Sequence, residues 1–232
     1  MGTYALVGGS RGIGAARRDR LLSDGHSLSI CCRDPLALPA DGSITGMTWD
    51  AADPDAPAPE LPERLDGVVY CPGSIDLTPF QRLRESDFRR AWELNLLGAV
   101  RFLQAARRGL LAAERSAVVL FSTVAVQTGL PLHASIASAK GAVEGLVRSL
   151  AAEWAPRVRV NAVAPSLTDT PLARDLLTDE RRRTHLARQN PLQRIGDPTA
   201  VAALVEHLLL APGSWITGQV VACDGGYGRL RT

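Results

Sequence analysis

Lys140 stands out by residue type as a candidate for chemistry. Of the 26 residues that are lysine or arginine, it alone is lysine. A lysine ammonium is compact and its pKa can be tuned, whereas a guanidinium is planar, larger and always charged. Where only surface charge matters, this chain uses arginine. We therefore expect Lys140 to work in a binding site rather than to supply surface charge.

A glycine-rich segment near the N-terminus is a second candidate, for binding phosphate. The apolar segment 4–9 runs into GGSRGIG (residues 8–14), and a helical pattern follows. Glycines let the backbone approach a pyrophosphate closely, and the N-terminus of the following helix faces the phosphate charge. The predicted contacts are Gly8, Ser10, Arg11, Gly12, Ile13 and Gly14.

The elements that must position these groups alternate along the chain. Buried strands are predicted at 4–9, 27–32, 67–71, 117–123, 157–165 and 218–224, and helices near 12–23, 86–113, 134–155 and 198–210. Such alternation is typical of a parallel sheet with helices on both faces. We predict one α/β domain over residues 1–232, a Rossmann-like doubly wound parallel sheet. The proline-rich segment 50–65 is predicted to be mostly loop.

Composition narrows the class of protein. The chain is 46% hydrophobic and 22% charged, and its net charge of +2 implies no strong attraction to nucleic acid or to an anionic membrane. No apolar run approaches the roughly 18–20 residues of a membrane span, and we expect no secretion signal and a cytoplasmic protein. The four cysteines lack metal-site spacing, so we expect reduced thiols and no metal site.

The chain resembles the short-chain dehydrogenase/reductase family over nearly its whole length. The glycine spacing Gly-x-x-x-Gly-x-Gly begins the resemblance. It continues through NLLG (95–98), FSTVA (121–125), ASAKGAVEGL (137–146), RVNAVAPSLTDTP (159–171) and WITGQVVACDGG (215–226). These segments follow the order and the distances of the family. The resemblance implies the family's fold and binding of a nicotinamide dinucleotide.

The residues after the second predicted strand favour NADP (NADPH) as the cofactor. An acidic residue there would hydrogen-bond the adenosine ribose and repel a 2′-phosphate. Here Cys32 is followed by Arg33, and Arg11 lies where the family often carries a basic residue when it uses NADP. Two guanidinium groups suit a phosphate. Alternatively both arginines are solvated, and Asp34 reaches the ribose if the strand ends one residue later.

The resemblance also implies cofactor contacts farther along the chain. Asp50 matches a residue that contacts the adenine amino group, and Thr170 matches one that contacts the nicotinamide amide. Tyr70 and Cys71 either touch the cofactor or belong to the core and a turn. The remaining implied contacts are Gly73, Asn95, Lys140, Pro165 and Leu167.

The reaction centre departs from the family. Members carry Tyr-x-x-x-Lys on one helix face, because residues i and i+4 are neighbours. Lys140 matches the lysine, but Ile136 stands in the position of the tyrosine. Thr123 matches the serine that hydrogen-bonds the substrate oxygen, whereas Ser122 is expected to face the other side of its strand. Asn95 matches the asparagine that anchors a water relay.

Four side chains are candidates to replace the tyrosine as proton donor. They are Thr123, His133, Ser135 and Lys140. Histidine suits proton transfer near neutral pH, and His133 precedes Ile136 by about one turn. Alternatively, His133 is a loop residue near the substrate entrance with no role in proton transfer.

These features predict an NADP-dependent oxidoreductase with an atypical proton relay, which transfers hydride to a small-molecule carbonyl, conjugated or imine substrate. For the last two, water can supply the proton. The alternatives are a non-redox dehydratase, isomerase or cyclase on the same fold, and a catalytically silent NADP-binding protein.

Two further segments bear on partners. Segment 178–189 falls where the family has its mobile substrate lid, and Arg181, Arg182 and Arg183 either meet an acidic substrate or form a solvated helix face. The helices at 86–113 and 134–155, with segment 215–226, resemble the surfaces that build family oligomers. We expect a homotetramer or a homodimer, with no nucleic-acid or membrane partner.

Overall fold

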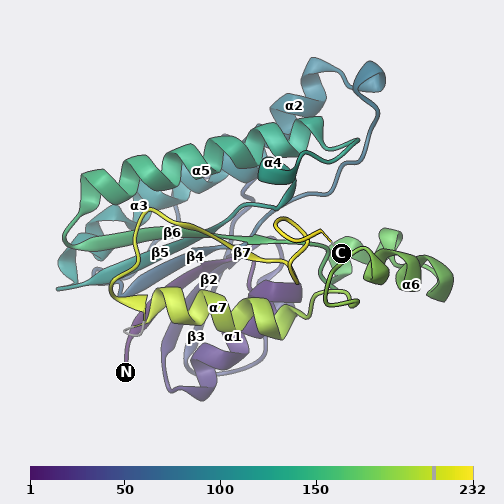
Figure 1. Ribbon diagram of the computed structural model, residues 1–232. Helices are drawn as coiled ribbons and strands as arrows, with labels where there is room; N and C mark the ends of the chain where they lie inside the picture. Colours follow the sequence, from purple (N-terminus) through teal and green to yellow (C-terminus); the bar gives the residue numbers. More distant parts are fainter. Residues whose placement is uncertain (211–212, 232) are drawn as a thin grey trace.

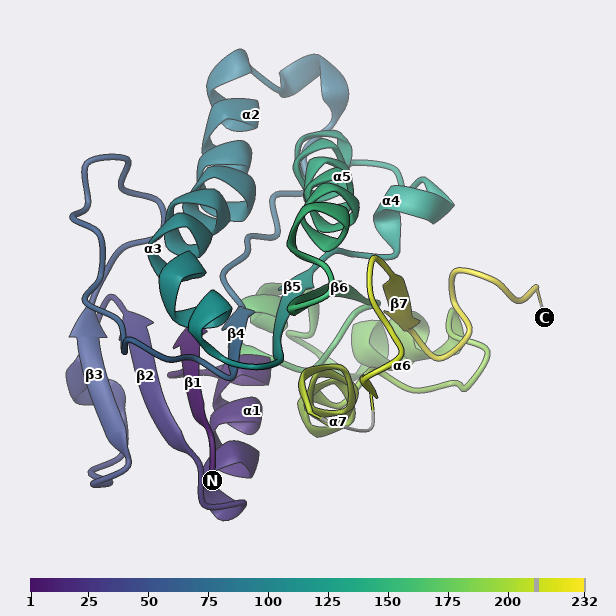
Figure 2. The ribbon, with the colours of Figure 1, turned by 90° about the vertical axis from the view of Figure 1, so that its left-hand side faces the viewer.

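The computed structural model describes residues 1–210 and 213–231, and a sheet of seven parallel strands forms its centre (Figure 1). The strands are β1 (Thr3–Val7), β2 (Ser27–Cys32), β3 (Ile44–Thr48), β4 (Gly67–Tyr70), β5 (Ser116–Phe121), β6 (Val158–Pro165) and β7 (Val220–Cys223). Their spatial order is β3-β2-β1-β4-β5-β6-β7, which Figure 2 shows from one end. The chain therefore winds outward from β1 in both directions, which confirms the predicted doubly wound fold.

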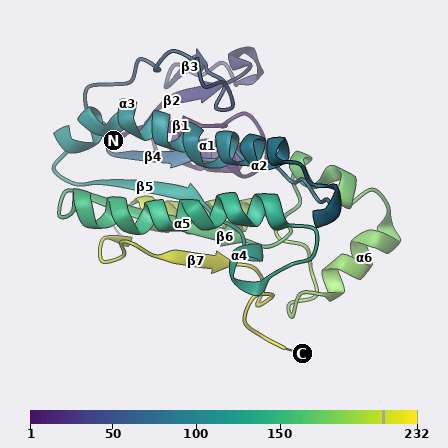
Figure 3. The same ribbon diagram turned by 90° about the horizontal axis from the view of Figure 1, so that it is seen from above.

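Helices cover both faces of this sheet. On one face lie α2 (Glu85–Trp92), α3 (Gly98–Ala112), α4 (Ala125–Thr128) and α5 (Ala134–Trp154), and on the other α1 (Gly12–Ser23) and α7 (Pro198–Leu209) (Figures 1 and 2). Helix α6 (Glu180–Arg188) lies beyond the carboxyl ends of the strands (Figure 3). Short 3₁₀ turns occur at Pro35–Ala37, Phe80–Arg82 and Pro171–Leu176.

Alternate residues of each strand serve two separate cores. Ala5 and Val7 of β1 pack in the cluster beneath α3 and α5, whereas Tyr4 and Leu6 pack in the cluster against α1 and α7. This division follows from the strand period of two, which sends neighbouring side chains to opposite faces. Because both faces are covered, most residues of the central strands are apolar, as the sequence indicated.

The six predicted strands are all present, helices α4 and α6 were not among the predicted helices, and two further points differ. Strand β3 was not predicted, because the edge segment 44–48 is largely solvent-exposed and lacks a buried apolar run. The single helix predicted at 86–113 is wrong, since a π-helical turn at Glu93–Leu97 separates α2 from α3. Segment 50–65 contains neither helix nor strand, as predicted. Within the described residues, no helix has both the length and the hydropathy needed to cross a bilayer.

The π-helical turn is held against the sheet by Tyr70. The Tyr70 hydroxyl donates a 2.6 Å hydrogen bond to the carbonyl oxygen of Leu94, and Tyr70 is 2% exposed. Tyr70 therefore belongs to the core, one of the two roles expected for it. Gly98 permits the close approach, since a Cβ added there would lie 2.5 Å from the Tyr70 hydroxyl and 2.3 Å from the Ala51 carbonyl oxygen. This packing fixes the turn that carries Asn95.

Gly98→Ala should therefore destabilise the protein. The added methyl group overlaps backbone and a buried phenol, and overpacking of this kind costs about 1–3 kcal/mol. We expect a lower melting temperature by calorimetry. Gly145→Ala on α5 is the matched control, because a Cβ at Gly145 meets no atom within 4 Å. Equal effects of the two substitutions would contradict this account of the packing.

Candidate active site

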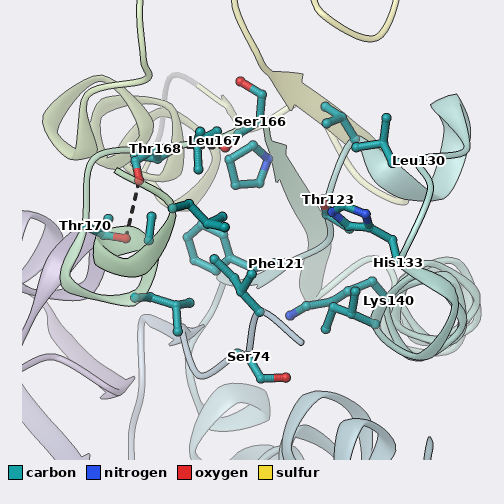
Figure 4. Close-up of a pocket in the computed structure, with 18 of the residues that line it drawn as sticks. Ser74, Phe121, Thr123, Leu130, His133, Lys140, Ser166, Leu167, Thr168 and Thr170 are labelled. Atoms are coloured by element: carbon teal, nitrogen blue, oxygen red, sulfur yellow. Dashed lines mark hydrogen bonds between the residues drawn. The ribbon is translucent and has the colours of Figure 1, made fainter. Parts of the chain in front are cut away.

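A cavity of about 360 Å³ opens at the carboxyl ends of β4, β5 and β6 (Figure 4). Its walls come from the segments that follow these strands and from α5 and α6, with a single residue of α1. In a doubly wound sheet, ligands bind in the crevice outside the carboxyl ends of the strands, near the point where the strand order reverses. The cavity is therefore where the fold places a ligand.

Lys140 contributes a buried cation to this cavity. Its side chain extends from α5, and the residue is 6% exposed (Figure 4). Burial lowers the pKa of Lys140 to about 8, against a slight opposing effect of Cys71. Burial also raises the pKa of the Cys71 thiol to about 12, so Cys71 supplies no counter-ion. Within 1–210 and 213–231, no carboxylate forms an ion pair with Lys140.

Asn95 and Lys140 approach each other at Gly73. The Asn95 side-chain amide donates a 2.8 Å hydrogen bond to the Ala91 carbonyl oxygen, while its own Oδ1 is buried without a partner among the described residues. A Cβ added at Gly73 would lie 3.4 Å from Asn95 Oδ1 and 3.6 Å from Lys140 Nζ. The structure thus places an acceptor and a cation, neither with a side-chain partner among the described residues, on either side of Gly73.

Thr123 and Ser122 have the different orientations that the sequence predicted. Thr123 lines the cavity, and its hydroxyl oxygen accepts a 3.3 Å hydrogen bond from the Ala125 backbone amide, which leaves its proton free to donate. Ser122 also lines the cavity, but its hydroxyl donates a 2.6 Å hydrogen bond to the buried carboxylate of Glu144 on α5. Of these two residues, Thr123 therefore has the hydroxyl available to a substrate.

His133 also lines the cavity, immediately before α5 (Figure 4). Its Nδ1 lies 2.7 Å from the Pro131 carbonyl oxygen. A carbonyl oxygen only accepts, so Nδ1 carries a hydrogen, and Nε2 is the ring nitrogen left for a ligand. The loop before the helix thus turns the imidazole toward the same space as Thr123 and Lys140.

Ser135 does not reach the cavity, contrary to the expectation that it could donate a proton there. It was a candidate proton donor, but it is 1% exposed and does not line the cavity, and its hydroxyl has no hydrogen-bond partner among the described residues. The reason is helical geometry: Ile136 and Lys140 share one face of α5, and Ser135 lies about 100° around the helix from Ile136. Ile136 itself lines the cavity and is 5% exposed.

Tyr227 is a lining residue that sequence reasoning missed. It follows Asp224, whose carboxylate accepts hydrogen bonds from the Gly226 and Gly228 amides at 2.9 and 2.8 Å. Aspartate before glycines signals a turn in the sequence. The direction in which that turn returns the chain depends on tertiary packing, so the sequence contained no sign that Tyr227 meets the cavity.

The glycine-rich loop forms a tight cradle beside the cavity. A Cβ added at Gly14 would lie only 2.0 Å from the Gly8 carbonyl oxygen, and one at Gly12 would lie 3.3 Å from Thr170. Ile13 joins the cavity lining. Other predicted cofactor contacts that line it are Gly73, Lys140, Pro165, Leu167 and Thr170. A narrow loop, an unpaired cation and an unsatisfied acceptor fit a nicotinamide dinucleotide.

The residues expected to contact the adenosine half of the cofactor comprise two exposed arginines and two aspartates that accept local backbone hydrogen bonds. Strand β2 ends at Cys32, as predicted, so the exposed Arg33 is the first residue beyond it. The Asp34 carboxylate accepts from the Leu36 amide at 3.1 Å and caps a short turn. Asp50 accepts from the Ala52 amide at 3.0 Å. Arg11 is exposed at the start of α1.

Comparisons with known proteins agree with this geometry. Residues 57–228 match the family model described as enoyl-(acyl carrier protein) reductase. The chain is 32% identical to the 3-oxoacyl-[acyl-carrier-protein] reductase MabA of Mycobacterium tuberculosis, over 96% of this chain and 91% of the relative. It is 31% identical to a tropinone reductase homologue of Arabidopsis thaliana, over 97% of this chain and 92% of the relative.

Solved structures show the same relationship. A short-chain dehydrogenase/reductase from Brucella melitensis matches with a TM-score of 0.87 and 26% identity, over 97% of this chain and 96% of the other. ElxO with NADP bound matches with a TM-score of 0.85 and 25% identity, over 98% and 99% of the two chains. The chain belongs to the short-chain dehydrogenase/reductase family. Its relatives are oxidoreductases, and the family and the loop together support a nicotinamide cofactor.

Lys140→Met should stabilise the protein without cofactor and remove cofactor binding. The substitution replaces an unpaired buried cation with an apolar side chain, and such changes at functional sites gain about 1–2 kcal/mol. We expect a higher melting temperature without NADPH, and no further rise when NADPH is added. Arg148→Met, at an exposed position of the same helix, is the control. A variant that NADPH still stabilises would contradict the assigned role.

The gain from Lys140→Met should also depend on pH. The folded-state pKa of Lys140 is about 8, below the 10.5 of an unperturbed lysine. Between these values the unfolded state binds more protons, so native stability rises with pH through this group. The advantage of the variant should therefore be largest below pH 8 and shrink toward pH 10.5. A constant difference in unfolding free energy would show that the buried charge is not its source.

Proposed function

We propose that this protein is an NADPH-dependent reductase that transfers hydride to a carbonyl, conjugated or imine bond of a small molecule. The observation that carries the proposal is the unpaired Lys140 ammonium, buried in a cavity that also presents the Thr123 hydroxyl. A buried charge without a partner is costly, and a bound cofactor with ribose hydroxyls would satisfy it. The bond to be reduced would then lie beside Thr123.

The residues divide between holding the cofactor and holding the substrate. The loop from Gly8 to Gly14 would face the pyrophosphate, Lys140 the nicotinamide ribose, and Thr170 the carboxamide. Bound there, the reduced nicotinamide supplies the hydride. Arg33 and Arg11 would face the 2′-phosphate, which favours NADPH over NADH. Asn95 Oδ1 and Lys140 Nζ both lie beside Gly73. Asn95 would therefore orient the polar groups that surround the reacting bond.

We assign the proton donor to His133, since Ile136 offers no hydroxyl. As hydride reaches the carbonyl carbon, the electron pair of the C=O bond moves to oxygen, which accepts a hydrogen bond from Thr123. The oxygen then takes the proton of His133 Nε2. The imidazole becomes neutral and keeps its Nδ1 hydrogen on the Pro131 carbonyl, 2.7 Å away. Lys140 stabilises the developing negative charge.

Loss of NADPH absorbance over a panel of ketones, enones and imines tests the reaction. His133→Gln should lower kcat on ketones by about 10²–10⁴-fold, the usual contribution of general acid catalysis. The loss should be smaller for enones and imines, which can take their proton from water. Conversion of a substrate with no consumption of NADPH would favour the non-redox alternative, and NADPH binding with no conversion would favour a silent protein.

A second variant identifies the proton donor. Ile136→Tyr places a phenol one turn before Lys140, so it should restore ketone reduction to the His133→Gln protein. Ile136→Phe has nearly the same bulk without the hydroxyl and should not restore it. If His133→Gln leaves ketone turnover unchanged, Tyr227, which lines the same cavity, becomes the candidate donor. Tyr227→Phe then tests that assignment.

Arg33→Asp tests the choice of dinucleotide. The substitution removes a charge-assisted contact to the 2′-phosphate and adds repulsion, which should weaken NADPH binding by roughly 1–3 kcal/mol. NADH lacks this phosphate and should be less affected. Titration calorimetry with both dinucleotides measures the difference. Equal losses would show that Arg33 does not read the 2′-phosphate.

A further inference from the structure

The charged side chains that line the cavity are all basic. Lys140 and Arg182 carry positive charge, and within the described ranges no aspartate or glutamate lines the cavity. The two cations come from different elements. Lys140 extends from α5, whereas Arg182 lies in the first turn of α6, where its backbone amide donates a 2.8 Å hydrogen bond to Asp179.

Three consecutive arginines of α6 have different surroundings. Arg183 forms an ion pair with Asp169. Arg181 is exposed and does not line the cavity, whereas Arg182 is exposed and does line it. In the part of the chain that the structure describes, no carboxylate forms an ion pair with Arg182. Arg182 is therefore the one of these three arginines that both lines the cavity and lacks an ion pair, a difference that the sequence does not reveal.

The wall near these cations is mainly aliphatic. Residues after β4, after α4 and around α6 contribute apolar side chains to the lining, together with Ile136. They are Leu77, Leu130, Leu172, Leu176 and Leu186. The nicotinamide would take part of the volume of about 360 Å³, and the part beside this wall suits a small apolar molecule. Of the two cations, Lys140 is assigned to the cofactor by the proposed function, which leaves Arg182 for the substrate.

We propose that Arg182 binds an anionic group of the substrate, so that the preferred substrates are apolar oxo compounds bearing a carboxylate or a phosphate. This inference rests on the proposed function. Arg182 is exposed, so a neutral apolar substrate would leave the guanidinium hydrated and gain no specific contact from it. An anionic group would accept charge-assisted, bidentate hydrogen bonds from it. Arg182 is thus a specificity-determining residue at the entrance to the cavity.

Equilibrium binding tests the proposal without turnover. Decanoate, decyl phosphate and decanol are titrated calorimetrically into the native protein saturated with NADP. The native protein should bind at least one anion about tenfold more tightly than decanol, and the stronger of the two identifies the carboxylate or the phosphate as the preferred group. Arg182→Gln should remove this preference and leave decanol binding unchanged. Arg181→Gln, one residue away on the same helix, should behave as the native protein.

Three results would overturn the inference. They are equal binding of the anions and decanol, absence of binding by all three, and equal losses in Arg182→Gln and Arg181→Gln. NADPH affinity is measured for each variant, because a matching loss of NADPH binding in Arg182→Gln would show that the guanidinium contacts the cofactor instead.

A kinetic comparison separates this inference from the proposed function. Straight-chain oxo acids and their methyl esters are compared as substrates with NADPH. We expect kcat/KM of the native protein to favour the acids, and Arg182→Gln to lower it about tenfold for the acids alone. Reduction of acids and esters at equal rates would refute the role of Arg182 and leave the reductase intact. If no acid, ester or compound of the wider panel causes NADPH oxidation, the proposed reductase activity itself is refuted.

Discussion

The site depends on one unfavourable feature, a largely buried ammonium group with no counter-ion among the described residues. Burial lowers the pKa of Lys140 to about 8, and the neighbouring Cys71 thiol has its pKa raised rather than lowered. The fold bears this cost because both cores are filled with apolar strand and helix residues. The sheet contributes stability and the site gives some of it up, and under the proposed function a bound cofactor would recover it.

Much of the fold could be predicted from the sequence, since apolar strands covered on both faces give an unambiguous pattern. Helix α1 was predicted with its observed limits, because the glycine loop and the turn at Gly25 mark both ends. Strand β3 and the π-helical turn could not be predicted. The edge strand β3 is largely exposed, so its sequence lacks the apolar pattern of a buried strand. The π-helical turn depends on a hydrogen bond between Tyr70 and Leu94, which are far apart in sequence.

The site was predictable where residue identity carries the chemistry, and unpredictable where packing decides direction. Lys140, Thr123 and Asn95 could be named because their order and spacing match a known family. Ser135 illustrates the limit, because adjacent helical residues face different surroundings and the sequence does not say which one faces the cavity. The three arginines of α6 illustrate it again, since Asp169 engages only one of them.

The cavity draws on residues from Ile13 to Tyr227, almost the full span of the chain. Its walls cannot form until the last segment, turned by Asp224, has packed against elements made first. Closing such long loops costs chain entropy that is recovered only when the distant contacts form. An incomplete nascent chain therefore has a glycine-rich loop but no finished cavity. For this reason, shortening the chain at Asp224 would remove part of the cavity wall while sparing every strand of the sheet.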